Sequence, residues 1–279
     1  MQLSFSKSSF FNGLALIGLI GLMAVSDRGA NRFDPVGDRS LALDYRARPG
    51  VAVEGPARLV GAWEVRARDP RFGGLSALAV ERGRLLAVSD SAVAMWLDPP
   101  GGAAPVVQLH SIAETAGDPA RKIGRDSEGL APDPLGRGWW LSYEQVHSLI
   151  LYDRRFDRAL ARIALSSPDF EPNLGVEAIW PDGTKIDWIA EASGVSDAAR
   201  LPDGRVAMIH RGIGPTGFHS WISGLGAPIR LRLGPLDNPE GIAAAPLPGG
   251  GTRLWIVTDN DFIRWRPTLL VAIDLPPKG

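Results

Sequence analysis

One short pattern recurs five times along the chain and limits the folds that it can adopt. Each copy has a polar residue, a short apolar stretch, a turn, an apolar strand and a closing charged residue. Two strands of five or six residues joined by a turn need about 14 to 16 residues. Each copy therefore predicts one β-hairpin whose opening and closing residues, its two feet, lie at the same end of a sheet. The copies are Ser76–Asp90, Glu128–Glu144, Glu177–Glu191, Asp197–Arg211 and Glu240–Asp259, with separations of 14, 16, 14, 14 and 19 residues.

The spacing of these hairpins predicts an all-β protein with the architecture of a β-propeller. Other apolar runs of strand length are separated by turn signals, and no stretch keeps a helical period over three turns. If each hairpin forms the inner strands of one blade, all the feet reach one mouth of a central channel. Openings 52, 49 and 43 residues apart fit one blade each.

The third and fourth hairpins open only 20 residues apart, which leaves no room for an outer hairpin between them. Either one blade is truncated there, or the fourth hairpin is the outer half of the third blade. We expect five or six blades. We also expect the ring to be closed by pairing between the N-terminal run Arg58–Val65 and the C-terminal run Thr268–Leu275.

The N-terminal segment has the pattern of an export signal. An apolar run of 16 residues extends from Phe10 to Val25, after Lys7 and before the small residue Ser26. This length is typical of a signal-peptide core and is short of the ~20 residues of a spanning helix. We expect residues 1–26 to be a signal peptide, or alternatively an uncleaved membrane anchor, so that the protein is periplasmic or secreted. Residues 27–56 are polar and arginine-rich and predict a linker or peripheral strap, followed by a propeller domain over residues 57–279.

Composition excludes several classes of function. The chain has 30 Lys and Arg against 31 Asp and Glu, which rules out the uniformly basic surface of a nucleic-acid-binding protein. It has no Cys, which excludes disulfides, Cys-ligated zinc and thiolate catalysis. We expect a monomer that contacts a membrane only through an uncleaved N-terminal segment.

Acidic residues recur at the predicted hairpin feet. Carboxylates that converge on one small space repel each other, so some must be protonated or a cation must neutralise them. With oxygen donors alone the favoured cation is Ca²⁺, then Mg²⁺ or Mn²⁺. The alternative is structural, with each acid accepting loop amides or pairing with an arginine of the next blade. The expected metal ligands are Asp90, Glu128, Glu177, Glu191, Glu240 and Asp259; Asp197 is a further foot, and Asn173, Asn238 and Asn260 lie near feet.

The ordered set of motifs resembles the phytase-like domain family, described as having esterase-like activity of phytase and found in exported bacterial proteins. The resemblance extends roughly from Leu59 to Ile273, with one departure in the short connection from Glu191 to Ser196. It implies a propeller with an acidic, calcium-binding centre that hydrolyses a phosphoester or ester. The motifs that carry it are Gly73–Leu78, Ser89-Asp90, Asp126–Leu130, Glu144, Asn173–Ala178, Glu191, Ser196-Asp197, Leu201–Gly204, Arg211, Asn238–Ile242 and Asp259–Phe262.

A hydrolase built on these residues has definable roles for them. Glu144, beside Glu128, is the expected general base. Arg211 would either clamp an anionic oxygen of the substrate or form a salt bridge that holds the acidic ring together. Further substrate contacts are expected from Arg125, Lys122 and Asn260.

Three functions therefore remain open from the sequence. The first is metal-dependent hydrolysis of a small-molecule ester or phosphoester. The second is a calcium-dependent lactonase on a similar propeller, which would prefer uncharged substrates and depend little on Arg211. The third is a non-catalytic ligand-binding propeller in which the acidic residues are structural.

Overall fold

The structure, a computed structural model, describes residues 37–112, 114–118, 121–165, 175–190, 194–263 and 265–278, without the side chain of Lys122. In these residues the chain forms strands β1 to β21 and a single short 3-10 helix, η1 (Lys122–Gly124). The predicted all-β fold class is confirmed. Among the described residues there is no helix that is long and apolar enough to cross a membrane. The predicted signal peptide or anchor, residues 1–26, lies outside the described residues.

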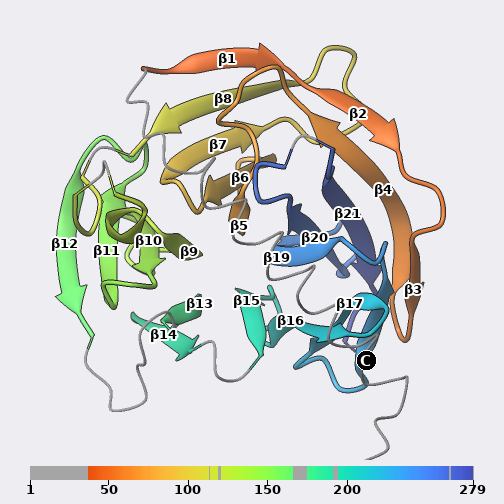
Figure 1. Cartoon of the computed structure of the whole chain (residues 1–279). Helices are drawn as coiled ribbons and strands as arrows, with labels where there is room; N and C mark the ends of the chain where they lie inside the picture. The colour runs from red at the N-terminus through yellow and green to blue at the C-terminus, as the bar shows by residue number, and fades with distance from the viewer. Residues whose placement is uncertain are drawn as a thin grey trace, which may run out of the picture.

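Five sheets stand around a common axis, and we number them blades 1 to 5 in chain order (Figure 1). Blade 1 runs outward through β5 (Leu75–Glu81), β6 (Arg84–Ser89), β7 (Val93–Leu97), β8 (Val106–Ser111) and β1 (Arg39–Ala42). Blade 2 runs through β9 (Ser127–Pro132), β10 (Gly138–Tyr143), β11 (Ser148–Asp153) and β12 (Ala159–Ala164). Blade 3 consists of β13 (Val176–Asp182) and β14 (Lys185–Ala190).

Blades 4 and 5 combine C-terminal and N-terminal strands. Blade 4 runs outward through β15 (Val195–Arg200), β16 (Val206–Gly214), β17 (Gly217–Ser223), β18 (Ile229–Arg232) and β3 (Ala52–Glu54). Blade 5 runs through β19 (Asn238–Pro246), β20 (Thr252–Asp259), β21 (Thr268–Leu275), β4 (Arg58–Arg66) and β2 (Asp44–Ala47). Part of the segment expected to be a linker or strap therefore supplies outer strands to three blades.

The five innermost strands close a ring around the axis. Strand β5 contacts β9, β9 contacts β13, β13 contacts β15, β15 contacts β19, and β19 contacts β5 again. Antiparallel pairing of β4 with β21, from Val65 opposite Thr268 to Arg58 opposite Asp274, completes blade 5. The prediction of a propeller closed by its N-terminal and C-terminal runs is therefore confirmed, with five blades in the described residues.

Blade 3 is the truncated blade. Strand β15 does not extend the sheet of β13 and β14 but begins the next sheet, where it pairs with β16. Its contacts with β13 and β19 place it in the inner ring. Of the two alternatives left by the sequence, the short blade is thus correct, and the fourth hairpin is a blade of its own.

A β-bulge marks the opening of each innermost hairpin. The register shifts between Leu75 and Ala77 in blade 1, and between Val176 and Ala178 in blade 3. Equivalent shifts occur in the other three inner hairpins. A bulge turns the extra residue out of the normal alternation and so redirects its side chain. In blades 1, 2, 3 and 5 this local geometry brings the opening residue of the repeat to one end of the channel, beside the closing residue of the same hairpin. In blade 4 the bulged residue is Ser196, and the predicted opening residue Asp197 follows it in the regular pairing.

Apolar side chains fill every interface between neighbouring blades. The largest clusters join blade 5 to blade 1 and blade 5 to blade 4. A third joins blades 1 and 2. The clusters on the two sides of blade 3 are smaller, and the one toward blade 4 has only Ala178, Val195 and Ala198 fully buried among the described residues. Burial of apolar surface between blades is therefore the main source of stability, and blade 3 contributes least to it.

Small residues follow the acidic openings because the innermost strands approach each other closely. A Cβ at Gly129 would lie 2.7 Å from the carbonyl oxygen of Glu177 in blade 3. A Cβ at Gly241 would lie 2.7 Å from Cγ2 of Val257 and 2.9 Å from the carbonyl carbon of Ala77 in blade 1. Neither space can hold a methyl group without separating two strands.

We therefore expect Gly241→Ala to lower the free energy of unfolding by about 1–3 kcal/mol, the usual cost of overpacking. Gly102→Ala is the matched control, since a Cβ at Gly102 would meet nothing within 4 Å. Urea unfolding followed by circular dichroism measures both variants. Equal stabilities would show that the inner strands can separate at no cost.

A second prediction concerns Asp133 in the turn between β9 and β10. Its carboxylate accepts hydrogen bonds of 2.8 Å from Nε and Nη2 of Arg137, and one of 2.9 Å from Nε1 of Trp140. The Arg137 hydrogen bonds, followed by those from its backbone and from Trp140, hold the pKa of Asp133 well below its ordinary value. The ionised carboxylate thus stabilises the fold above the unfolded-state pKa, and this contribution is lost as the pH falls through the folded-state pKa.

We expect Asp133→Asn to lower the free energy of unfolding by about 2 kcal/mol at neutral pH, the contribution of hydrogen bonds to a charged group. The difference from the wild type should shrink steadily below about pH 4. Asp203→Asn is the control, because Asp203 binds Arg205 in a similar turn but its side chain is 26% exposed, against 1% for Asp133. Denaturant titrations at several pH values test this, and a pH-independent difference would contradict it.

Candidate metal centre

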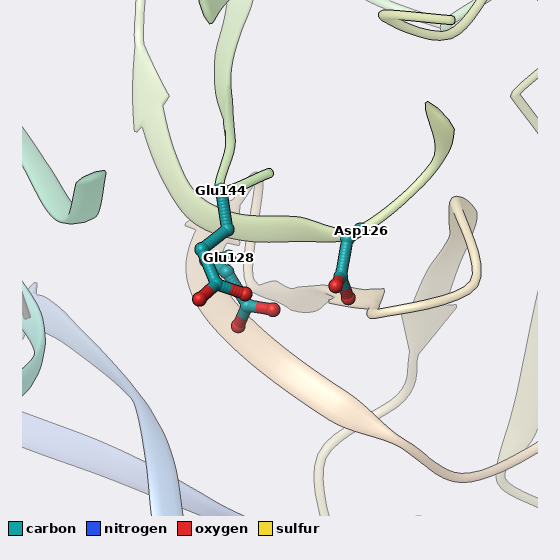
Figure 2. Close-up of side chains that lie close together, drawn as sticks. All are labelled: Asp126, Glu128 and Glu144. Atoms are coloured by element: carbon teal, nitrogen blue, oxygen red, sulfur yellow. The ribbon is translucent and has the colours of Figure 1, made fainter. Parts of the chain in front are cut away.

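Three carboxylates meet at the foot of the blade 2 hairpin. Oxygen atoms of Asp126, Glu128 and Glu144 all lie within 4.8 Å of one another, and Figure 2 shows the three side chains gathered at one place. Asp126 directly precedes β9 and Glu128 lies at the β-bulge near its start, and the two carboxylates are directed to the same place. Glu144 directly follows β10, and its backbone amide donates a hydrogen bond of 3.1 Å to the carbonyl oxygen of Asp126.

Asp126 belongs to this cluster but was not among the residues predicted as ligands from the sequence. Its position two residues before Glu128 was a signal that could have identified it. Its Oδ2 accepts a hydrogen bond of 2.6 Å from Nε2 of Gln145, which holds the carboxylate in place.

Glu128 is surrounded by the acidic residues of neighbouring blades. Its pKa is raised well above the ordinary value, first by its removal from bulk water and then by the negative charges of Glu177, Asp126, Glu144 and Glu240. These charges come from blades 2, 3 and 5. The predicted convergence of acidic feet on the axis therefore takes place at Glu128.

A second group of carboxylates lies at the foot of the blade 5 hairpin. The pKa of Asp259 is also raised, first by burial and then by the charges of Asp261 and Asp90, with a smaller contribution from Glu240. The backbone amide of Asp261 donates a hydrogen bond of 2.7 Å to Oδ1 of Asp259. Glu240 influences both Asp259 and Glu128, so the two groups form one continuous acidic mouth.

Asp197 has a different environment from the other feet. It is fully buried, and it accepts hydrogen bonds from the backbone amides of Ala198, at 2.8 Å, and of Ile242, at 2.7 Å. The amide of Leu78 also acts to lower its pKa, but burial outweighs these hydrogen bonds and raises the pKa overall. Asp197 thus ties the inner strands of blades 1, 4 and 5 together, which is a structural role.

Three arginines supply positive charge at the mouth. Nη1 of Arg211 forms an ion pair with Oε1 of Glu240, and it donates a hydrogen bond of 3.2 Å to Asn238. Arg266, which is buried, pairs with Asp261. Arg125 is 1% exposed; burial lowers its pKa, while the charges of Asp90 and Asp126 raise it.

These arginine side chains mainly hold the neighbouring acidic residues in place. Arg211 forms the salt bridge that was one of its two predicted roles. Arg125 lies beneath the surface, where direct contact with a substrate would require the surrounding loop to move. The side chain of Lys122 lies outside the described residues.

The remaining predicted site residues have varied environments. Oδ1 of Asn260 accepts hydrogen bonds from the amides of Gly74, at 3.0 Å, and Phe262, at 3.1 Å, so this side chain joins two loops at the mouth. Asp90 accepts a hydrogen bond of 3.2 Å from Ser91. Glu191 and Asn173 lie outside the described residues. Glu177, at the bulge of blade 3, is buried.

Two polar residues beside the feet pack within the blades, as alternation along a strand predicts. The hydroxyl groups of Tyr143 and Tyr152 lie 2.8 Å apart in the core between blades 1 and 2. His210 stacks on Trp221 in blade 4.

The donor set of the mouth fits a hard cation. Asp126, Glu128 and Glu144 offer only carboxylate oxygens, at separations that one ion can bridge. Four neighbouring carboxylates help to raise the pKa of Glu128, so binding a cation there would remove this repulsion.

Comparison with protein families agrees with this picture. Residues 70–193 match the model of the phytase-like family, described as esterase-like activity of phytase. Over these residues the chain is similar to that family. The match covers blades 1 to 3, including Asp90, Asp126, Glu128, Glu144 and Glu177. It ends before the feet of blades 4 and 5.

Solved structures with a related overall arrangement are distant. Glutaminyl cyclase from Myxococcus xanthus has a TM-score of 0.42 and 11% identity, over 79% of this chain and 97% of that one. A chain of the nidogen/laminin complex has a TM-score of 0.39 and 11% identity, over 80% and 89%. Because these scores are low, the propeller assignment rests on the ring of five sheets. A comparison with curated proteins finds no significant match.

The raised pKa of Glu128 leads to a prediction for the metal-free propeller. A carboxyl group whose folded-state pKa is raised loses stabilising free energy as the pH rises above its unfolded-state pKa. In excess chelator, Glu128→Gln should therefore melt roughly 2–4 °C above the wild type at about pH 8, the shift expected for about 1 kcal/mol. The difference in melting temperature between the variant and the wild type should become smaller toward about pH 5.

Asp187→Asn, which removes an exposed carboxylate from β14, is the control and should melt like the wild type at both pH values. Differential scanning calorimetry measures the transitions. A Glu128→Gln variant that is less stable than the wild type at both pH values would mean that the Glu128 carboxylate stabilises the metal-free fold.

Proposed function

We propose that this propeller is a member of the phytase-like family and an exported, metal-dependent hydrolase of small-molecule esters or phosphoesters, with Ca²⁺ bound in the acidic mouth. One observation carries the proposal: in the described residues, eight carboxylates from blades 1, 2, 3 and 5 meet three guanidinium groups at the mouth. The carboxylates are Asp90, Asp126, Glu128, Glu144, Glu177, Glu240, Asp259 and Asp261. Such an excess of negative charge is a reason to bind a cation, and the match to the phytase-like family supports a hydrolytic role.

Asp126 and Glu128 are the residues that we assign to the ion, with Glu144 beside them left unligated and Glu177 and Glu240 close enough to add negative charge. When bound, a calcium ion supplies a Lewis acid that polarises a phosphoryl or carbonyl oxygen. Oxygen-only coordination also admits Mg²⁺ or Mn²⁺, so the experiment below identifies the bound metal by measuring the metal content of the protein.

The chain's own residues would handle water and protons. We assign Glu144 as the general base, because it stands at the end of β10 with its carboxylate at the mouth. Gly175 keeps it in place: a Cβ at Gly175 would lie 2.4 Å from Cα of Glu144, so the two backbones are in contact. The Glu144 carboxylate would accept a proton from an attacking water. The negative charges of Asp126 and Glu128 would help to orient that water.

The pairing of Arg211 with Glu240 favours a second candidate within the same chemistry, an uncharged ester such as a lactone. A guanidinium already engaged with a carboxylate is less able to neutralise a phosphate. A phosphoester substrate would have to displace Glu240 from Arg211, whereas a neutral ester would not. A non-catalytic binding propeller is the remaining alternative and is an outcome of the experiment below.

The experiment measures metal content, melting and hydrolysis on the same protein. After mild dialysis we expect bound calcium, a lower melting temperature in chelator, and recovery on adding Ca²⁺. Hydrolysis of p-nitrophenyl phosphate, p-nitrophenyl acetate and a simple lactone is then assayed. Glu144→Gln should lower the rate about 100-fold or more, as loss of a general base does. Asp44→Asn, which changes an exposed ion pair on β2, is the control.

The substrate classes are separated by the double variant Arg211→Ala with Glu240→Gln, which removes the pair without leaving either charge alone. A selective loss of phosphatase activity indicates a phosphoester; unchanged ester hydrolysis indicates an uncharged substrate. Metal-dependent melting without hydrolysis would support the binding propeller. A metal-free protein whose melting ignores both chelator and Ca²⁺ would refute the metal centre altogether.

A further inference from the structure

Blade 4 has two faces of different character. Ile209, Ile222 and Leu231 point toward blade 5 and belong to the apolar core between the two blades. On the opposite face one cross-strand row runs across four strands, His210 opposite Trp221, Trp221 opposite Arg230, and Arg230 opposite Glu54. This face is directed toward blade 3, because Ala198 and Met208 on the same side pack against Ala178 and Trp180.

The outer part of this face extends beyond the strands of blade 3. Blade 3 has only β13 and β14 in the described residues, whereas blade 4 has five strands (Figure 1). A cavity of about 560 Å³ opens over β17 and β18. Its size is in the range of small-molecule pockets. The side chains that line it on this face are those of Glu54, His219, Trp221, Arg230 and Arg232.

Trp221 forms one fixed wall of the cavity. Its ring centroid lies 4.9 Å from that of His210, with an angle of 5° between the rings. This separation equals the spacing between neighbouring strands, so the two rings stand upright, face to face, on β16 and β17. His210 is itself held by a hydrogen bond of 2.7 Å between its Nε2 and Oγ of Ser223. The other face of the indole therefore points toward β18 and the cavity.

His219 extends this wall along β17. Its ring lies 6.1 Å from that of Trp221 at an angle of 13°, so the two rings are nearly parallel. The two rings, at alternate positions of β17, give this face of blade 4 two parallel aromatic surfaces. A planar ligand can stack on such a surface with little loss of side-chain entropy, because the rings are already in place.

Positive charge lies on the neighbouring strand β18, where Arg230 is paired directly with Trp221. Arg230 and Arg232 are two residues apart on β18 and point to the same side. Arg232 forms an ion pair with Glu54. Among the described residues Arg230 has neither an ion pair nor a ring contact, and the cation–π pairs lie elsewhere. The cavity thus carries one uncompensated positive charge.

We propose that this cavity, which we call the blade 4 slot, binds a planar aromatic monoanion such as an aryl carboxylate. The ring of the ligand stacks on Trp221 and His219, and its carboxylate meets the guanidinium of Arg230. The neutralised pair of Arg232 and Glu54 closes the end of the slot. The slot is separate from the acidic mouth, and the proposal does not depend on metal binding or hydrolysis there.

The test is isothermal titration calorimetry of the full chain with 2-naphthoate as the probe, in chelator and again in Ca²⁺. We expect saturable one-to-one binding, weakened about 10-fold or more in Trp221→Ala and Arg230→Gln, since stacking and charged hydrogen bonds each carry at least that much. Trp265→Ala and Arg46→Gln remove an exposed tryptophan and an exposed arginine elsewhere and should bind like the wild type. Methyl 2-naphthoate and cyclohexanecarboxylate should both bind more weakly, since one lacks the charge and the other the planar ring.

Melting curves of each variant ensure that loss of binding is not loss of fold, and the exposed changes His219→Ala and Arg230→Gln keep the test valid if Trp221→Ala unfolds. The proposal is overturned if 2-naphthoate binds equally to the wild type, Arg230→Gln and His219→Ala, or does not bind at all. Equal affinity for the neutral ester would also overturn the assignment of an anion. These binding measurements do not depend on hydrolysis at the mouth, so the two proposals can fail separately.

Discussion

The pairing of β4 with β21 is the interaction on which the rest of the structure depends. The chain has no cysteine, so backbone hydrogen bonds between its N-terminal and C-terminal parts replace any covalent closure of the ring. Only a closed ring keeps five hairpins at fixed angles around one axis. If β4 separated from β21, the apolar surfaces of blade 5 would be exposed and the carboxylates at the mouth would move apart.

Repulsion at the mouth works against this closure. Removing Glu128 and Asp259 from water while other carboxylates surround them raises their pKa values, which means that the metal-free fold carries these charges at a cost. The small residues Gly129 and Gly241 let the inner strands approach closely enough to hold the acids together all the same. Apolar burial between the blades must offset that cost.

The sequence predicted the parts of the fold that follow a local period. The hairpins and the closing pair could be found because residue spacing limits where strands can run, and the same spacing left two alternatives for the third blade. Strand β12, mostly exposed, and β17, which mixes Gly, Ser and His with aromatic residues, have no clear alternation and were missed. Pairing between different blades could not be predicted either. The ion pair of Arg211 with Glu240 depends on how blades 4 and 5 meet, which no single repeat specifies.

Three short N-terminal strands, β1, β2 and β3, are the outermost strands of three blades. They are four, four and three residues long, and each covers the outer edge of a longer strand, β8, β4 and β18 respectively. A bare sheet edge invites pairing with another chain, whereas a very short edge strand with charged side chains discourages it. Residues 39–54 therefore contribute to solubility as well as to shape: a shortened chain without them would offer three open edges for self-association.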